Sequence, residues 1–224
     1  MTDCELIVVA KHPELGRVKT RLARGIGDRG AFELYCAFIA DIVTNFGAGP
    51  HDFWIAYTPP DAPFEACGAR SFAQEGATLN SRLLAIFERQ RGRVRKTIVM
   101  SSDSPHVASA WVARGFAALD AVDVILGPCD DGGYWCVGMR EPHDIFSGVA
   151  MSTPEVLAQT LHLVNALGLR YELLPTTFDV DELTDLARLR AEIASRLTAL
   201  PATACVLEAL DAAGDLVLSD SHDR

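Results

Sequence analysis

Near the start of the chain stands Glu5-Leu-Ile-Val-Val-Ala10, followed at once by Lys11-His-Pro-Glu-Leu-Gly-Arg17-Val-Lys19-Thr20-Arg21-Leu22. The first run is short, apolar and partly β-branched, which predicts a buried β-strand. The second run contains a proline and a glycine, which interrupt regular structure, and it carries four cations. Ligands of an open parallel sheet bind beyond the carboxyl ends of its strands, so this basic loop is the first place to look for a site.

The remainder of the chain alternates short apolar runs with longer stretches of helical period, which predicts the α/β class with a mainly parallel sheet. The expected strands are Leu6–Ala10, Phe53–Tyr57, Arg70–Ala73, Thr97–Met100, Val122–Leu126, Tyr134–Val137 and Arg170–Leu174. The expected helices are Arg29–Phe46, Ser81–Arg89, Ala108–Leu119, Pro154–Leu167 and Leu183–Ser195. In the first helix the apolar face is expected at positions with spacings of three or four: Phe32, Cys36, Ile39 and Val43.

Composition excludes several classes of protein. Twenty Lys and Arg against thirty Asp and Glu give a net charge of −10, which argues against general binding to nucleic acid or anionic membranes. No apolar run reaches about 18 residues, so no membrane span is expected, and the N-terminus lacks the pattern of a secretory signal. The six cysteines form no Cys-x-x-Cys pair and indicate neither a zinc site nor a disulfide scaffold. We therefore expect a cytoplasmic protein.

A length of 224 residues predicts a single domain. We place this domain at residues 1–210. Residues 211–224 combine charged and small side chains with little to bury, so we expect them to form a flexible tail.

The cations of the basic loop suit phosphate chemistry. Guanidinium and ammonium groups beside free backbone amides can hold a diphosphate through charge-assisted hydrogen bonds. A solvated basic loop is the alternative, but the position after the first strand favours function. The spacing does not match a Walker A sequence.

Carboxylates follow three other expected strands. Asp103 in Ser101-Ser-Asp-Ser-Pro105 could bind Mg²⁺ with substrate phosphates, or it could cap a helix, and spacing alone rates the two readings equal. Gly127-Pro-Cys-Asp-Asp131-Gly-Gly-Tyr-Trp135 indicates a substrate-contacting loop, with an ordinary Asp-Gly turn as the alternative. Asp179-Val-Asp181 offers further oxygen ligands, with helix capping by Asp181 as the competing explanation. The six histidines have no metal-ligand spacing, and no Ser-His-Asp set is recognisable, so transfer at phosphate is favoured over hydrolysis.

The ordered motifs Lys11-His-Pro13, Gly16-Arg-Val-Lys-Thr-Arg-Leu22, Ser102-Asp-Ser-Pro105, Gly127-Pro, Asp131-Gly-Gly-Tyr134, Met151-Ser-Thr153 and Asp179-Val-Asp-Glu-Leu183 resemble a bacterial glycosyltransferase-like family. Its members are often labelled arsenosugar-biosynthesis glycosyltransferases, and the resemblance spans about residues 6–189. It implies a GT-A fold, a three-layer α/β sandwich that commonly holds a nucleotide diphosphate through Mg²⁺ or Mn²⁺. This sequence departs from the family at Asn80, where the family often has glycine, and at Met151, where it often has tryptophan.

The resemblance also implies roles for individual residues. Nucleotide and phosphate binding falls to Lys11, Arg17, Lys19, Thr20, Arg21, Gln74 and Gly76. Asp103 and Asp181 would bind the metal, Asp131 and Asp103 would be catalytic, and the substrate would contact Gly132, Gly133 and Tyr134.

These observations predict a metal-dependent transferase with a nucleotide-sugar donor and a small-molecule acceptor. The Lys19-Thr-Arg-Leu22 segment is also similar to phospholactate guanylyltransferases, so nucleotidyl transfer from a nucleoside triphosphate is the second reading. A non-catalytic nucleotide-binding module is the third. Nucleic acid is not an expected partner, and a homodimer is one option for assembly.

Overall fold

The computed structural model describes residues 3–62, 64, 67–195 and 198–213. These residues form strands and helices that alternate along most of the chain, which confirms the expected α/β class. In chain order the elements are β1 (Cys4–Lys11), α1 (Ala23–Phe46), β2 (Asp52–Thr58), β3 (Arg70–Ala73), α2 (Leu79–Gln90), β4 (Lys96–Ser101), α3 (Ser109–Ala118), β5 (Val124–Pro128), β6 (Tyr134–Met139), α4 (Val156–Ala166), β7 (Tyr171–Leu173), α5 (Leu183–Ser195) and α6 (Pro201–Ala213).

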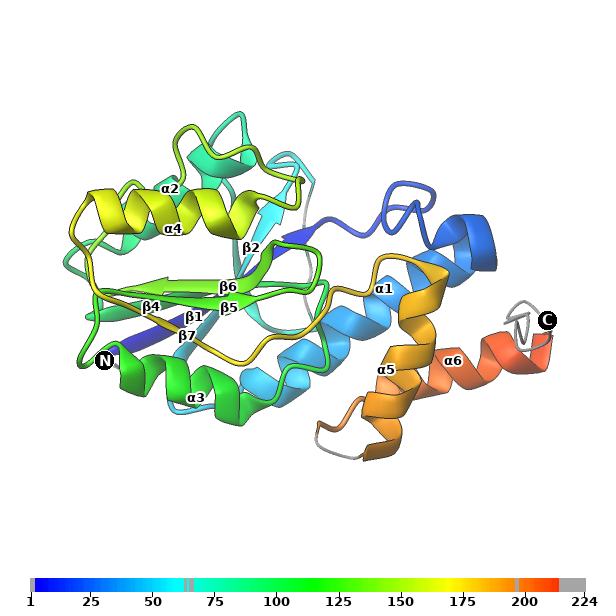
Figure 1. Cartoon of the computed structure of the whole chain (residues 1–224). Helices are drawn as coiled ribbons and strands as arrows, with labels where there is room; N and C mark the ends of the chain where they lie inside the picture. Colours follow the sequence, from blue (N-terminus) through cyan, green and yellow to red (C-terminus); the bar gives the residue numbers. More distant parts are fainter. Residues whose placement is uncertain (1–2, 63, 65–66, 196–197, 214–224) are drawn as a thin grey trace.

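The seven strands form one sheet in the order β3-β2-β1-β4-β6-β5-β7. All are parallel except β6, which runs antiparallel to both of its neighbours, β4 and β5. In the centre of the sheet Val8 pairs with Ile55 on one side and with Met100 on the other. The carboxyl ends of the parallel strands therefore share one edge, and the short loop that joins β5 to β6 lies at that edge as well (Figure 1).

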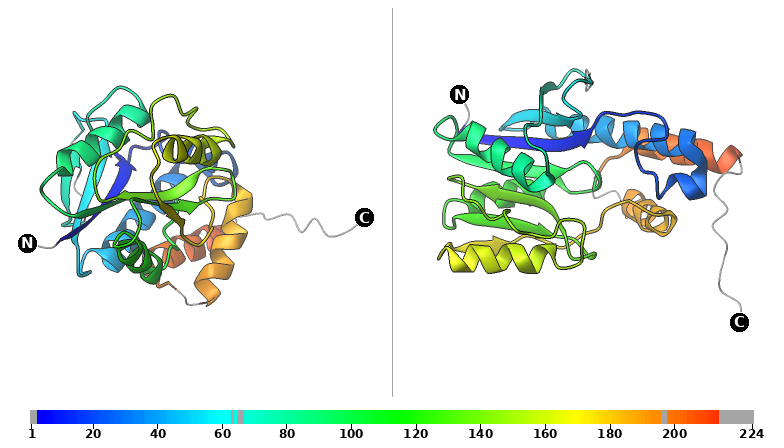
Figure 2. Two further views of the ribbon diagram at one scale, coloured as in Figure 1. Left: turned by 60° about the vertical axis from the view of Figure 1, so that its left-hand side comes forward. Right: turned by 90° about the horizontal axis from the view of Figure 1, so that it is seen from above.

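Helices cover both faces of the sheet (Figure 1). Alternation along β1 sends Leu6 and Val8 into the core beneath α1 and α3, and sends Ile7 into the core beneath α2 and α4. Helices α5 and α6 extend the first of these cores and lie toward the edge where the parallel strands end (Figures 1 and 2). This packing builds the three-layer sandwich.

Helix α1 differs from the expectation in its start and in its buried face. It begins at Ala23 and is interrupted at Gly27, whose φ of 75° and ψ of 159° are not helical, before it continues to Phe46. Of the expected face only Ile39 is buried. The core instead takes the neighbouring positions Ala31, Leu34, Tyr35, Phe38, Ile42 and Phe46. The expected face was wrong because α1 is apolar around most of its circumference, so spacing alone did not select one side.

Helix α6 was not expected from the sequence, and the boundary that we placed after residue 210 falls inside it. Its first turn is capped from a distance by Asp41 of α1, which is 1% exposed. The Asp41 carboxylate accepts the backbone N–H of Ala202 at 3.0 Å and that of Thr203 at 2.8 Å. Residues 214–224, the rest of the expected tail, lie outside the described residues.

None of the six cysteines takes part in a disulfide bond. Within the described ranges, no helix is both long and apolar enough to cross a membrane.

Candidate functional site

Lys19 lies at the centre of the polar groups at the carboxyl edge of the sheet. Its ammonium donates to Asp181 Oδ1 at 2.9 Å and also contacts Asp103 Oδ1. The Lys19 side chain is only 4% exposed, so a full positive charge is held inside the fold by two carboxylates. Burial alone would lower the Lys19 pKa, but the charges and hydrogen bonds of Asp103 and Asp181 outweigh it and raise that pKa.

Asp103 is fixed by the turn that follows β4. Its backbone N–H donates to Ser101 Oγ at 3.0 Å, and the Ser101 hydroxyl donates to Asp103 Oδ2 at 3.2 Å. Burial works to raise the pKa of Asp103, yet the nearby Lys19 cation lowers it, so the carboxylate stays ionised. The N-cap residue of α3 is Ala108, and no side chain caps this helix, so Asp103 does not have the capping role for α3 that the sequence left open.

The segment between β7 and α5 brings Asp179 and Asp181 to Asp103. Its path is set by backbone hydrogen bonds, including Val180 N–H to Asp103 O at 2.9 Å. The N–H groups of Asp181 and Glu182 donate to the Asp185 carboxylate, at 3.0 and 2.8 Å. The Asp185 carboxylate therefore accepts from the N–H groups just before α5, and the Asp181 side chain bonds to Lys19 instead.

Asp179 is a third carboxyl beside this pair. It accepts a hydrogen bond from Ser104 Oγ at 2.5 Å and one from the Cys129 thiol at 3.6 Å. Burial and the negative charge of Asp103 raise the pKa of Asp179 to about 6. We define the Lys19 cluster as Lys19, Asp103, Asp179 and Asp181.

Tyr35 of α1 supports this edge and was missed from the sequence. Its hydroxyl accepts the Lys11 N–H at 2.9 Å, donates to the Lys11 carbonyl at 3.2 Å and lies 3.2 Å from Ser102 Oγ. It thereby joins the ends of β1 and β4. Burial raises its pKa to about 12, so it stays a hydroxyl. The spacing of Tyr35 with Phe38 and Ile42 could have indicated an inward side chain, although not its hydrogen bonds.

The other expected phosphate ligands are spread along the loop after β1. Lys11 is exposed at the end of β1, and its charge contributes to lowering the pKa of Asp103. Arg17 points into solvent, with a side chain 74% exposed, and pairs with Glu14 at 3.1 Å. Thr20 and Arg21 are exposed. Of the five, the structure brings Lys19 to the carboxylates, keeps Lys11 near them and leaves the remaining three facing water.

Gln74 and Gly76 follow β3, two strands away from β1 along the same edge. The Gln74 side chain is 6% exposed and its amide donates to the Ala56 carbonyl at 2.7 Å. Gly76 has φ of 126°, and a Cβ there would lie 2.6 Å from Ser81 Oγ. Both features have a structural explanation within β2 and the start of α2, so the resemblance alone assigns these residues to the nucleotide.

The loop between β5 and β6 carries the expected acceptor residues. Asp131 is exposed and its Oδ1 accepts the Gly133 N–H at 2.8 Å. Gly132 has φ of 87°, and a Cβ at that position would lie 1.9 Å from the Pro154 carbonyl oxygen. Gly132 is thus required because its backbone lies against Pro154 of the same chain and because its φ is positive. Gly133 does not have a positive φ.

Tyr134 was expected to contact substrate, but its hydroxyl is buried. Burial raises its pKa to about 12, and the nearby group is the Thr160 hydroxyl of α4. The ring packs against the core beneath α2 and α4. Tyr134 thus has a packing role in the core, and the structure gives it no place among the exposed groups of the edge.

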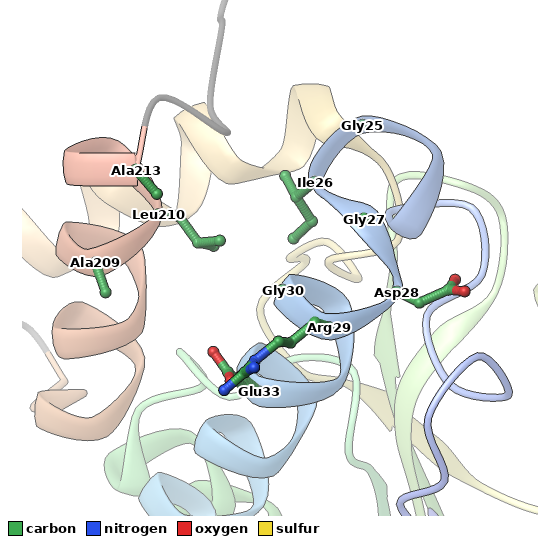
Figure 3. A pocket seen from close by; sticks show the side chains of 10 residues that line it. All are labelled: Gly25, Ile26, Gly27, Asp28, Arg29, Gly30, Glu33, Ala209, Leu210 and Ala213. Carbon is green, nitrogen blue, oxygen red and sulfur yellow. The ribbon is translucent and has the colours of Figure 1, made fainter.

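A cavity of about 440 Å³ lies between the start of α1 and α6 (Figure 3). Its charged side chains are Asp28, Arg29 and Glu33, of which Arg29 and Glu33 pair with each other at 2.8 Å. The remaining lining is glycine, alanine, Ile26 and Leu210. None of the Lys19 cluster lines it. This cavity is therefore separate from the Lys19 cluster.

Comparisons with solved structures define the class of protein. A crystal structure from Desulfovibrio desulfuricans G20, described as a candidate nucleotide-diphospho-sugar transferase, is 28% identical, with a TM-score of 0.87 over 95% of this chain and 96% of that one. CMP:2-keto-3-deoxy-manno-octonic acid synthetase in complex with CTP is 13% identical, with a TM-score of 0.53 over 86% and 99%. A 4-diphosphocytidyl-2C-methyl-D-erythritol synthase from Anaerococcus prevotii is 9% identical, with a TM-score of 0.52 over 85% and 96%. The chain has the fold of nucleotide-diphospho-sugar transferases and cytidylyltransferases. The Desulfovibrio structure confirms the expected class, a transferase.

Residues 43–153 match the family described as "Uncharacterized protein conserved in bacteria (DUF2064)". This match and the Desulfovibrio structure confirm the resemblance that the motifs indicated. Asp103 and Asp131 lie inside the matched segment, whereas Lys19 and Asp181 lie outside it. No curated protein matches the sequence significantly.

Proposed function

We propose that the protein is a divalent-metal-dependent transferase that uses a nucleotide-sugar donor and a small-molecule acceptor. The observation that carries the proposal is the meeting of Asp103 and Asp181 on one buried cation, Lys19, at the carboxyl edge of the sheet. In an open α/β sheet this is the edge at which ligands bind. The match to a structure described as a candidate nucleotide-diphospho-sugar transferase supports the choice of donor.

The residues fit a divalent metal that is shared with a ligand. The described residues contain no group of three or more His, Cys, Asp or Glu side chains suited to hold a metal by themselves. Mg²⁺, however, commonly takes only one or two carboxylates and completes its shell with substrate phosphates and water. The Lys19 ammonium stands in for a cation between Asp103 and Asp181, which are therefore the proposed metal ligands. A metal bound there would neutralise charge on the diphosphate leaving group.

The chain's own residues would bind and orient the donor. Lys11, Arg17 and Arg21 would attract the phosphates, and Lys19 would stabilise the charge that develops as the diphosphate leaves. In this reaction the bond from the anomeric carbon to the diphosphate oxygen breaks and a bond to the acceptor nucleophile forms. The acceptor proton must leave, and Asp131, exposed on the β5–β6 loop, is the proposed catalytic group on the acceptor side. Cysteines that form no disulfide suit a reducing compartment, so the proposal places the protein in the cytoplasm.

Nucleotidyl transfer is the second candidate, favoured by the fold shared with a synthetase bound to CTP. The same cations would then surround a triphosphate, the acceptor oxygen would attack the α-phosphorus, and pyrophosphate would leave. The two reactions release different products. Pyrophosphate identifies nucleotidyl transfer, and a nucleoside diphosphate identifies glycosyl transfer.

The test is a thermal-shift panel of nucleotide sugars and nucleoside triphosphates, each with and without Mg²⁺ or Mn²⁺, followed by product analysis of the ligands that stabilise. A specific ligand raises the melting temperature by mass action, by an amount set by its concentration relative to Kd. We expect metal-dependent stabilisation by at least one nucleotide sugar. Stabilisation only by triphosphates would favour the second candidate. Tight binding without turnover of any acceptor would favour a non-catalytic module, and no stabilisation by any nucleotide would refute the proposal.

A further inference from the structure

We propose that the Lys19 ammonium is a resident counter-ion that keeps a divalent metal out of the Asp103–Asp181 pair until a polyphosphate draws it away. Metal and polyphosphate would then bind cooperatively, with little metal binding to the free protein. The inference rests on the proposed function, because it concerns the same carboxylates, but it adds an order of events that a shared fold does not imply.

The pattern of exposure supports this inference. The Lys19 side chain is 4% exposed, whereas the Asp103 and Asp181 side chains are 37% and 44% exposed. The cation is therefore enclosed and the carboxylates face the solvent. Both carboxylates direct Oδ1 at Lys19, and Asp103 Oδ2 accepts from Ser101 at 3.2 Å. The oxygens that a metal would need are already neutralised by one positive charge.

A metal and the ammonium cannot share this position. Mg²⁺ requires oxygen ligands at about 2.0–2.1 Å in octahedral geometry. An ammonium in contact with the same oxygens would repel a divalent ion at a distance of a few ångströms, where the interior screens charge weakly. Metal entry therefore requires that Lys19 move.

A polyphosphate provides the reason for it to move. Lysine has a flexible four-carbon stem with three rotatable donors, so its ammonium can exchange carboxylate for phosphate partners. Lys11, Arg17 and Arg21 lie on the same loop and attract the same anion. By linkage, if polyphosphate strengthens metal binding by some factor, metal strengthens polyphosphate binding by the same factor.

The experiment measures Mn²⁺ retained by the protein in equilibrium dialysis, with and without inorganic pyrophosphate, against protein-free pyrophosphate as the blank. For the wild type we expect weak Mn²⁺ binding alone and binding at least about tenfold tighter with pyrophosphate. Lys19→Met removes the charge and leaves an unbranched side chain that is one heavy atom shorter, so this variant should bind Mn²⁺ alone at least about tenfold more tightly than the wild type. It should also lose most of the enhancement by pyrophosphate.

Arg24→Gln is the matched control, since it removes one charge just beyond the same loop, at an exposed position to which we assign no role in binding. We expect its Mn²⁺ binding without pyrophosphate to stay within about twofold of wild type, because exposed charges are screened. An equal gain in Arg24→Gln and Lys19→Met would mean that general electrostatics governs metal affinity, and would overturn the proposal. So would wild-type Mn²⁺ binding that is as tight without pyrophosphate as with it.

A second measurement uses the wild-type protein, so it does not depend on whether a variant folds without the buried Lys19 charge. The chain contains three lysines, Lys11, Lys19 and Lys96, so the ammonium signals in a nitrogen-edited NMR spectrum are few. We expect the Lys19 signal to be unchanged by Mg²⁺ alone and to shift when pyrophosphate and Mg²⁺ are both present. A Lys19 signal that moves with Mg²⁺ alone would contradict the proposed order. If neither pyrophosphate nor any nucleotide binds, the proposed function fails. If they bind while Lys19 stays in place, only the further inference fails.

Discussion

At the scale of single residues, Asp103 is the most direct test of the site. Asp103→Asn removes a charge but little volume, and the amide can still meet Ser101 and support the turn after β4. We expect metal-dependent nucleotide binding to weaken at least about tenfold in a folded protein, because losing a carboxylate ligand costs at least as much as losing an outer-shell partner. Calorimetry with Mn²⁺ and the nucleotide found in the ligand panel measures the change.

Asp123→Asn is the control for this variant. Asp123 pairs with Arg170 at 3.3 Å before β5 begins, at the opposite edge of the sheet. Equal effects of the two substitutions, or unchanged affinity in folded Asp103→Asn, would remove Asp103 from the list of metal ligands.

Glu5 gives a prediction about pH that does not involve the site. It lies in β1, is 4% exposed, and has a pKa raised from 4.5 to about 7 by burial and by the charge of Asp52. The folded state therefore holds the proton more tightly than the unfolded state, so stability falls as pH rises from about 4.5 to 7 and then levels off. The shift corresponds to on the order of 3 kcal/mol.

Glu5→Gln removes this titration. As pH rises from 5 to 8, the wild type should lose the contribution of Glu5 to its free energy of unfolding, whereas the variant should not. We therefore expect the free energy of unfolding of the variant minus that of the wild type to increase over this range, measured by urea denaturation with circular dichroism. A difference between the two proteins that stays constant over this range would show that Glu5 titrates normally.

Among the elements, the β5–β6 loop contains two adjacent glycines that we expect to respond differently to substitution. An alanine at Gly132 would be strained at φ of 87° and would place Cβ 1.9 Å from the Pro154 carbonyl oxygen, so we expect a loss of roughly 2 kcal/mol or more. An alanine at Gly133 would meet the end of the Asp131 side chain at 3.1 Å, and we expect a loss below about 1 kcal/mol. Chemical denaturation of both variants makes the comparison, and equal losses would mean that the loop does not depend on its contact with the 154 segment.

The elements themselves were largely predictable from the sequence, but their partners were not. Strand β3 and helix α5 have the bounds that periodicity predicted, because their turns and apolar spacing are local features. The antiparallel direction of β6 and the pairing of its loop with the 154 segment depend on contacts between distant residues. Helix α6 was missed because part of what stabilises its start, Asp41, lies more than 150 residues earlier in the chain.

The same division holds for the site. Lys19, Asp103 and Asp181 were candidates because each follows a strand that ends at the same edge. Their convergence, the partners of Asp179 and the role of Tyr35 arise from tertiary packing. The buried positions of the Tyr134 hydroxyl and of Gln74 could not be predicted, because the sequence does not record the direction in which a side chain points.

At the scale of the whole molecule, a net charge of −10 opposes the approach of an anionic donor, so the basic loop must act locally. We expect Arg21→Ala to lower nucleotide affinity at low ionic strength and to have a smaller effect at high salt, since Arg21 is exposed and screened. Titrations at two salt concentrations measure both. Equal affinity of the wild type for a nucleoside diphosphate and for its parent nucleoside would contradict the assignment of these cations to phosphates.

The packing of α6 on α1 has a consequence for the order in which the protein can mature. During synthesis α1 emerges early, but Gly30 and its neighbours receive Leu210 only after the last described helix has left the ribosome. The buried carboxylate of Asp41 has no N–H partners from residues 202 and 203 until then. For most of its translation, the nascent chain therefore lacks the α6 residues of the core beneath α1 and α3. A ribosome that stalls before residue 201 would expose the apolar side chains that α6 covers, and chaperones could bind them.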